Sequence, residues 1–202
     1  MKNLEEQDIK VILVGESGTG KTSLISISMG IKFQEGMEIS TSAASFVTKI
    51  IKIGDKSYTL NLWDTIGQEK FRSLTKIFIK DSKIVIFVYD ITNKKSFEEL
   101  DYWYKTIKDV LGESAVLGIA GNKQDLFTQE QVPEDMAEKY AESKGIPFKL
   151  TSAKNPLTFN LFLEDLLKQY IVKCGGVVET TSGQKLDNKV ENKESKLGKC
   201  CK

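Results

Sequence analysis

The segment 15–22 has the residue types and the spacing that bind phosphate groups. It reads GESGTGKT, follows the apolar run 10–14 and precedes a helical pattern, so it matches G-x-x-x-x-G-K-[ST] in its strand–loop–helix context. Its glycines let successive backbone N–H groups point inward, and the helix that follows adds the positive end of its dipole. We expect Lys21 to reach the β- and γ-phosphates and the Thr22 hydroxyl to bind Mg²⁺. The segment therefore predicts binding of a nucleoside triphosphate.

A second segment, Asn122-Lys123-Gln124-Asp125, indicates which base is bound. A carboxylate at Asp125 can accept hydrogen bonds from N1–H and the 2-amino group of guanine, whereas adenine offers no such pair of donors. A carboxylate left unmet in a buried site makes the wrong base costly. Asn122 is expected to tie neighbouring loops together, and the Lys123 stem to lie over the base. This four-residue string is weak evidence by itself. The alternatives are a P-loop ATPase and a small-molecule kinase, and Asp125 argues against both because adenine would leave its carboxylate unpaired.

Two further loops supply the rest of a GTP site. The segment 64–69 reads DTIGQE, in which Asp64 can hold Mg²⁺ through a water, the Gly67 N–H can touch the γ-phosphate and Gln68 can orient the attacking water. The segment 151–154 reads TSAK, and the Ala153 N–H can bind guanine O6. Together the four loops predict hydrolysis of GTP by water.

Composition agrees with this chemistry. The chain has 202 residues and no histidine, which excludes Ser-His-Asp and Cys-His relays and His-based zinc sites. Its three cysteines (Cys174, Cys200, Cys201) are too few and too badly spaced for a disulfide framework. The net charge of +1 gives no overall basic field, so no nucleic-acid partner is expected. Residues 1–172 carry a net charge of −2 and residues 173–202 one of +3.

The alternation of strand and helix patterns predicts the fold that positions these loops. We expect an α/β three-layer fold, with a six-stranded, mostly parallel sheet, one antiparallel edge strand and helices on both faces. Its ligand lies beyond the carboxyl ends of the strands. Residues 1–172 form the nucleotide-binding domain, and 173–202 a disordered tail, since periodicity is lost from residue 175. The expected strands are 10–14, 45–53, 56–64, 83–89, 115–120 and 147–150, and the expected helices 21–29, 69–80, 95–111, 133–144 and 157–172.

With four motifs in this order over about residues 8–172, the chain resembles the Ras superfamily of small GTPases. The WDTxGQE string, YDIT at 89–92 and the C-terminal cysteine pair look like the Rab family. The resemblance implies the P-loop NTPase (small G-protein) fold, GTP and GDP as substrate and product, catalytic roles for Lys21 and Gln68, and Mg²⁺ held by Thr22, Thr41 and Asp64. The nucleotide contacts that it implies are Gly15, Ser17, Gly18, Thr19, Gly20, Lys21, Thr22, Ser23, Phe33, Thr41, Gly67, Asn122, Lys123, Asp125, Leu126, Ser152, Ala153 and Lys154.

The same resemblance implies a cellular role. It predicts a monomeric switch in vesicle trafficking with slow hydrolysis, on the cytoplasmic face of an intracellular membrane and cycling with the cytosol. Its expected partners are an exchange factor, a GTPase-activating protein that supplies the missing arginine finger, effectors and a GDI or escort protein. Prenyl groups on Cys200 and Cys201 would anchor it, the alternative being two unmodified thiols. Phe46, Trp63 and Phe78 match the aromatic triad that Rab proteins present to effectors, the alternative being ordinary sheet packing.

Two positions depart from the family pattern. The segment 32–45 is one residue longer than usual, so Ser40 and Ser42 compete with Thr41 as the Mg²⁺ ligand. Ile66 stands where alanine is usual, and a β-branched side chain there can restrict the hinge or misplace Gln68. The alternative is that Ile66 packs outward. These changes make a second function conceivable: a GTP-bound scaffold with little hydrolysis.

Overall fold

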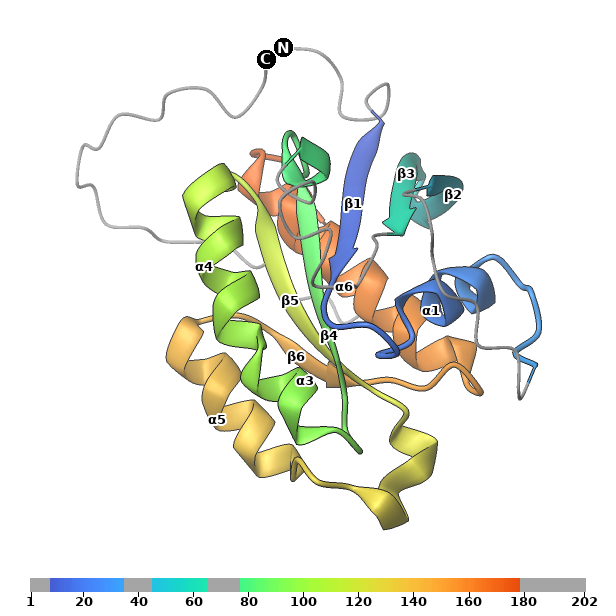
Figure 1. The fold of residues 1–202 in the computed structure, drawn as a ribbon. Coiled ribbons are helices and arrows are strands. Elements are labelled where there is room, and N and C mark those ends of the chain that lie inside the picture. Colours follow the sequence, from blue (N-terminus) through green and yellow to red (C-terminus); the bar gives the residue numbers. More distant parts are fainter. Residues whose placement is uncertain (1–7, 35–44, 65–76, 179–202) are drawn as a thin grey trace.

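The six strands form a single sheet in the order β2-β3-β1-β4-β5-β6. The structure is a computed structural model that describes residues 8–34, 45–64 and 77–178 (Figure 1). Only β2, which pairs with β3, runs antiparallel, and the other neighbours are parallel. The predicted sheet and its antiparallel edge are confirmed. The strands are β1 Ile9–Val14, β2 Ser45–Ile53, β3 Lys56–Asp64, β4 Ile84–Asp90, β5 Val116–Asn122 and β6 Phe148–Leu150.

Burial explains why the strands differ in sequence pattern. Every residue of β4 and β5 is buried, because helices cover both faces of the central sheet, and these strands are apolar almost throughout. In β3, by contrast, Tyr58, Leu60 and Leu62 are buried and alternate with partly exposed residues. The hairpin of β2 and β3 lies at the edge of the sheet, where one face is packed and the other meets solvent.

Helices form a layer on each side of the sheet (Figure 1). One core is formed where α1 (Lys21–Ser28) and α6 (Pro156–Lys173) pack on the sheet, with Phe162 and Leu166 among its buried residues. The other is formed with α4 (Leu100–Leu111) and α5 (Glu134–Lys144), and Trp103 is its largest buried side chain. Gly118 of β5 allows α6 to approach, because a Cβ there would lie within 3 Å of both Phe162 and Leu166.

Two predicted elements differ from the structure. The helix expected at 95–111 is two helices, α3 (Lys94–Glu98) and α4, which meet at Glu99 with φ −72° and ψ −8°. The apolar residues of both face one core, so their periodicity does not mark the break. A 3₁₀ helix, Gln124–Gln129, begins within the Asn122–Asp125 segment and buries none of its residues, which leaves no apolar pattern to predict it from. Of the helix expected at 69–80, residues 69–76 lie outside the described residues.

The end of α6 is tied to the loop that precedes β5. The Lys173 Nζ donates hydrogen bonds to the carbonyl oxygens of Glu113 and Ala115, at 2.5 and 2.9 Å. After the helix the chain turns at Gly175, whose φ is +81°, and Val178 packs against the α1–α6 core. Within the described residues no helix has the length and apolar character needed to cross a bilayer. Residues 179–202, including Cys200 and Cys201, lie outside the described residues.

Candidate nucleotide-binding site

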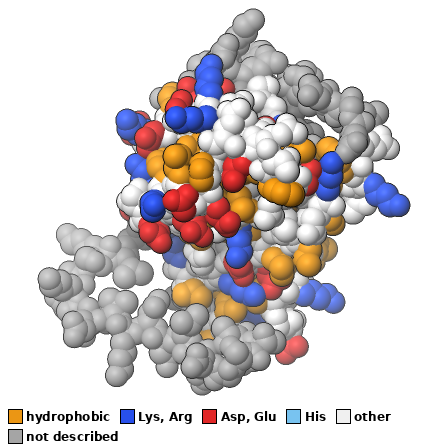
Figure 2. Space-filling model, turned by 90° about the horizontal axis from the view of Figure 1, so that it is seen from below, with side chains coloured by type: hydrophobic (Ala, Val, Ile, Leu, Met, Phe, Trp, Pro, Cys, Tyr) orange, Lys and Arg blue, Asp and Glu red, His pale blue; other side chains and the backbone are white. Residues whose placement is uncertain are grey.

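The glycine-rich loop joins β1 to α1 at the carboxyl edge of the sheet. Gly15 must be glycine because its φ is +149° and a Cβ would lie 2.1 Å from the Val88 carbonyl oxygen. Gly20 has a φ of +90°, and a Cβ there would lie 2.3 Å from the Asn122 side-chain nitrogen. The loop therefore follows its neighbours closely, and its backbone is shaped as the motif predicts. Figure 2 looks onto this edge and shows backbone and uncharged polar side chains with charged groups around them.

Lys21 lies inside this loop at the start of α1. Its Nζ donates hydrogen bonds to the carbonyl oxygens of Gly15 and Glu16, at 2.9 and 2.8 Å. Burial lowers the pKa of Lys21 to about 8, against the opposing effect of the nearby Asp64 and Glu16 carboxylates. The side chain is only 5% exposed, so a cation is held where the loop is expected to take phosphate.

Thr22 and Asp64 meet beside the loop. The Thr22 hydroxyl donates a hydrogen bond of 2.6 Å to Oδ2 of Asp64, which lies buried at the end of β3. These are hard oxygen donors, so the pair fits a Mg²⁺ ion that takes its remaining ligands from phosphate and water. No group of three or more Asp, Glu or Cys that could hold a metal occurs within 8–34, 45–64 and 77–178. The structure thus brings together two of the three predicted metal ligands, while Thr41 lies outside the described residues.

Asn122 connects three loops at the end of β5. Its side-chain nitrogen donates a hydrogen bond of 2.8 Å to the Thr19 carbonyl oxygen of the glycine-rich loop. Its side-chain oxygen lies 3.4 Å from the Thr151 hydroxyl, which follows β6. Asn122 is 1% exposed, so these contacts are buried and fix the phosphate loop relative to the base loops.

Asp125, the predicted base-reading carboxylate, is held by two residues of the loop after β6. The Ser152 hydroxyl donates a hydrogen bond of 2.5 Å to Oδ1, and the Lys154 Nζ lies 3.3 Å from Oδ2. Partial burial raises the pKa of Asp125, but the bonds from Ser152 and Lys154 outweigh it and the net shift is downward. The group is therefore an ionised acceptor at neutral pH, as pairing with guanine requires.

Asp90 lies in the YDIT string at 89–92, but the sequence analysis gave it no role in the site. Its Oδ2 lies 2.7 Å from the Lys123 Nζ, while its Oδ1 accepts hydrogen bonds from the Thr92 backbone and hydroxyl. The ion pair holds Lys123, whose backbone is in the left-handed region with φ +68°. Its position could have identified it as a site residue, because Asp90, like Asp64, is a carboxylate at the carboxyl end of a buried strand.

The remaining predicted nucleotide contacts divide into three groups. Ser17 and Gly18 are exposed on the glycine-rich loop, and Ser23 and Leu126 are half-buried beside it and beside Asp125. Phe33 is 40% exposed and lines a cavity together with Ala153 and Lys154. The contacts Thr41, with its rivals Ser40 and Ser42, and Gly67 lie outside the described residues, as do the catalytic Gln68 and the unusual Ile66.

The predicted effector aromatics form a continuous row. The Phe46 and Trp63 rings stack with centroids 4.9 Å apart, and the Trp63 and Phe78 centroids are 6.2 Å apart. Trp63 and Phe78 pack partly on the core, whereas Phe46 is 51% exposed. The Lys10 Nζ lies 4.7 Å from the Trp63 ring centre in a cation–π contact. The row is thus both part of the sheet packing and a partly exposed aromatic surface.

The fold and these loops define a P-loop nucleotide-binding protein with a base loop suited to guanine. A model of the Ras family matches residues 10–172. Human Ras-related protein Rab-21 is 43% identical over 162 residues, covering 80% of this chain and 72% of that protein. Bovine Ras-related protein Rab-26 is 38% identical over 160 residues, covering 79% of this chain and 62% of that protein. The chain therefore belongs to the Ras family, among the Rab GTPases.

Proposed function

We propose that this protein is a membrane-anchored switch in vesicle trafficking that binds GTP and GDP with Mg²⁺ and hydrolyses GTP slowly. The observation that carries the proposal is the meeting, at one edge of the sheet, of Lys21, the Thr22–Asp64 pair and the Asp125 carboxylate. Asn122 ties the glycine-rich loop to the loop after β6, and Thr22 joins the first of these to Asp64. Relatives named Rab-21 and Rab-26 support the role in trafficking.

Hydrolysis in this site depends on positioning and charge rather than on a histidine base. Backbone N–H groups and Lys21 hold the phosphates, Thr22 and Asp64 hold the magnesium ion, and Gln68 orients the attacking water. A Mg²⁺ ion held by Thr22 and Asp64 would neutralise charge that develops on the phosphates. Contacts of the γ-phosphate with Thr41 and Gly67 order two segments, and hydrolysis releases them. No residue of the chain is identified as an arginine finger, so an activating protein supplies one, worth roughly 10³–10⁵ in rate.

The effect of Ile66 separates a cycling switch from a GTP-bound scaffold. We expect Ile66→Ala to raise the single-turnover rate of GTP hydrolysis by roughly 3–10-fold, because removal of a β-branched side chain frees the hinge beside Gln68. The measurement is quenched-flow or HPLC detection of GDP from protein preloaded with GTP. Ile77→Ala, which shortens an isoleucine that is 70% exposed, serves as the matched control and leaves the rate unchanged.

An Ile66→Ala rate equal to that of the unaltered chain would show that Ile66 packs outward. If neither the unaltered chain nor Ile66→Ala hydrolysed GTP measurably, the GTP-bound scaffold would be favoured. The altered segment 32–45 would then be the expected cause. Rapid hydrolysis by the purified, unaltered protein would instead contradict the need for an activating protein.

The membrane anchor is proposed at Cys200 and Cys201. Two prenyl chains hold a protein stably at a bilayer where one binds marginally, and nearby lysines of the basic tail add attraction to anionic lipid. We expect mass spectrometry of protein from cells to find both cysteines prenylated. The double change Cys200→Ser and Cys201→Ser is expected to move the protein from the membrane to the soluble fraction, whereas Cys174→Ser is not. An unmodified C-terminus on membrane-bound protein would contradict the anchor.

The partners follow from this cycle. An exchange factor loads GTP, an activating protein ends the signal, and a GDI or escort protein carries the lipidated form between the cytoplasmic face of a membrane and the cytosol. Effectors are proposed to dock on the row of Phe46, Trp63 and Phe78, because exposed aromatic clusters often mark interfaces. The protein acts as a monomer.

A further inference from the structure

The end of β4 fastens both ends of the base loop, residues 122–131, which carries Asp125. The Ile91 backbone N–H donates a hydrogen bond of 3.1 Å to the Asn122 carbonyl oxygen, where the loop begins. The Ile91 carbonyl oxygen accepts hydrogen bonds of 2.8 and 3.1 Å from the backbone N–H groups of Gln131 and Val132, where the loop ends. Ile91 is 1% exposed, so these bonds are shielded from water. One residue next to β4 therefore closes the loop that is expected to read the base.

The two neighbours of Ile91 fix a side chain inside that loop. Asp90 pairs with Lys123 through Oδ2, and the side chains of the pair are only 8% and 34% exposed. The other carboxylate oxygen, Oδ1, accepts hydrogen bonds of 2.8 and 2.7 Å from the backbone N–H and the hydroxyl of Thr92. Thr92 thus orients the carboxylate and leaves Oδ2 for the lysine. The pair holds a four-carbon side chain that would otherwise rotate freely.

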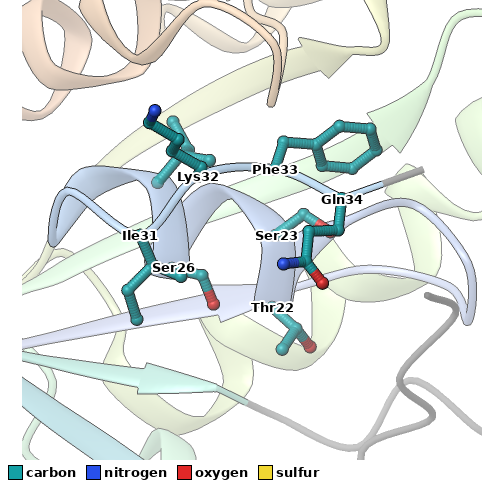
Figure 3. A pocket seen from close by; sticks show the side chains of 8 residues that line it. Thr22, Ser23, Ser26, Ile31, Lys32, Phe33 and Gln34 are labelled. Atoms are coloured by element: carbon teal, nitrogen blue, oxygen red, sulfur yellow. The ribbon is translucent and has the colours of Figure 1, made fainter.

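This restraint concerns the residue whose stem is expected to lie over the base. A lysine that is free in the empty site loses rotational freedom when a ligand immobilises it, and that loss weakens binding. Phe33, another predicted nucleotide contact, is 40% exposed, and in Figure 3 its ring points away from Thr22 and Ser23. Lys123, by contrast, is already held in the nucleotide-free protein, so its ordering costs little when the nucleotide binds.

We propose that Asp90 is a positioning residue for the guanine nucleotide. It draws the Lys123 ammonium to the end of β4, so that the methylene stem of the lysine faces the base. The inference rests on the proposed function, because it concerns the binding of GDP and GTP. Its consequence is slow release of the nucleotide, since differences in affinity among variants of one site appear mostly in the dissociation rate.

Release of a fluorescent GDP analogue from the full-length protein tests the proposal. Asp90→Asn is expected to speed release roughly 3–10-fold, which is the range that corresponds to immobilising one long side chain on binding. Lys123→Met keeps an unbranched apolar stem but cannot pair with Asp90, and we expect a similar increase. Because Lys123 is partly exposed, this second variant tests the pair even if Asp90→Asn does not fold.

The double variant separates positioning from a general weakening of the fold. If Asp90 acts through Lys123, the variant that carries both Asp90→Asn and Lys123→Met is expected to release GDP about as fast as either single variant. If the two residues acted independently, their effects would multiply to roughly 10–100-fold. A multiplied effect would overturn the proposal.

Asp101→Asn is the matched control. Asp101 on α4 also pairs with a lysine, Lys144 at 3.1 Å, and also accepts a hydrogen bond from a hydroxyl, that of Tyr140 at 3.0 Å. It belongs to none of the loops of the nucleotide site. We expect Asp101→Asn to release GDP at the rate of the unaltered chain, and an increase equal to that of Asp90→Asn would contradict a specific role for Asp90.

NMR of the lysine side-chain nitrogens reports on the ion pair directly and needs no nucleotide. The signal of the Lys123 ammonium can be assigned by its absence from Lys123→Met. We expect its hydrogens to exchange slowly with water in the unaltered chain and rapidly in Asp90→Asn. Slow exchange that persists in Asp90→Asn would show that another group holds the lysine, and would overturn the proposal.

The release measurement also distinguishes this inference from the proposed function. An unaltered chain that binds no GDP would overturn the proposed function, and this inference with it. An unaltered chain that binds GDP, together with unchanged release from both Asp90→Asn and Lys123→Met, would overturn the positioning role alone.

Discussion

Replacement of Asp125 by asparagine is expected to lower the affinity for GDP by roughly 10²–10⁴-fold, because a site built to pair with a substrate's donors rejects a mismatch strongly. The carboxylate lies beside Ser152 and Lys154, which keep it ionised, so both of its oxygens act as acceptors. An amide presents one donor in place of one acceptor. Xanthine carries an oxygen where guanine carries its 2-amino group, so the same variant is expected to gain affinity for XDP.

Titrations of fluorescent GDP and XDP against the variant and the unaltered chain measure both effects. Asp135→Asn is the matched control, since Asp135 is an exposed carboxylate that also pairs with a lysine, Lys139. It is expected to change neither affinity. Retention of GDP affinity by Asp125→Asn would show that another group reads the base, whereas equal loss for both nucleotides would show that Asp125 acts only by holding the Ser152 loop.

The elements that were predictable from sequence are those whose burial, on one face or on both, leaves a clear pattern of apolar residues. The hairpin at 45–53 and 56–64 was located to the residue, because its alternation of apolar and polar side chains allows one register, with Phe46 opposite Trp63. The continuous apolar runs at β4 and β5 indicated strands buried on both faces, although each strand ends up to two residues beyond its predicted end, at Asp90 and Asn122. Once the strands were predicted, the motif loops could be placed at their carboxyl ends.

The contacts that were not predictable join residues far apart in the chain. The pair of Lys123 and Asp90 spans two loops, and no local pattern specifies that these two side chains meet. Lys173 likewise finds its carbonyl partners nearly sixty residues away, at Glu113 and Ala115. Such contacts depend on strand order and on the direction in which each helix leaves the sheet. The residue types in the motifs therefore indicated which side chains gather at the carboxyl edge of the sheet. They did not indicate which of these side chains form hydrogen bonds or ion pairs with one another.

Replacement of Lys21 by methionine is expected to weaken nucleotide binding and to stabilise the nucleotide-free protein. Loss of the ammonium removes a charge-assisted contact to phosphate from a buried site, for which we expect a fall of roughly 10²–10³-fold in GDP affinity. Methionine keeps an unbranched side chain of similar length without the charge. Lys52→Met, at an exposed position, is the control and is expected to change neither property.

The gain in stability follows from the pKa of Lys21, which burial lowers from 10.5 to about 8. Between these values the unfolded chain binds more protons than the folded one, so the free energy of unfolding rises as the pH rises from about 8 to 10.5. Below pH 8 the buried charge costs the nucleotide-free protein about 3 kcal/mol, since the pKa is lowered from 10.5 to about 8 and one pKa unit corresponds to 1.36 kcal/mol.

Denaturant unfolding of the nucleotide-free forms at pH 7 and pH 10 tests this argument. Lys21→Met is expected to be more stable than the unaltered chain at pH 7, and the difference is expected to shrink at pH 10, where Lys21 has lost its charge. A variant that is less stable at pH 7 would show that the bonds from Lys21 to the Gly15 and Glu16 carbonyl oxygens outweigh the burial of its charge. The expected result means that the loop keeps a destabilising cation because phosphate, once bound, compensates for it.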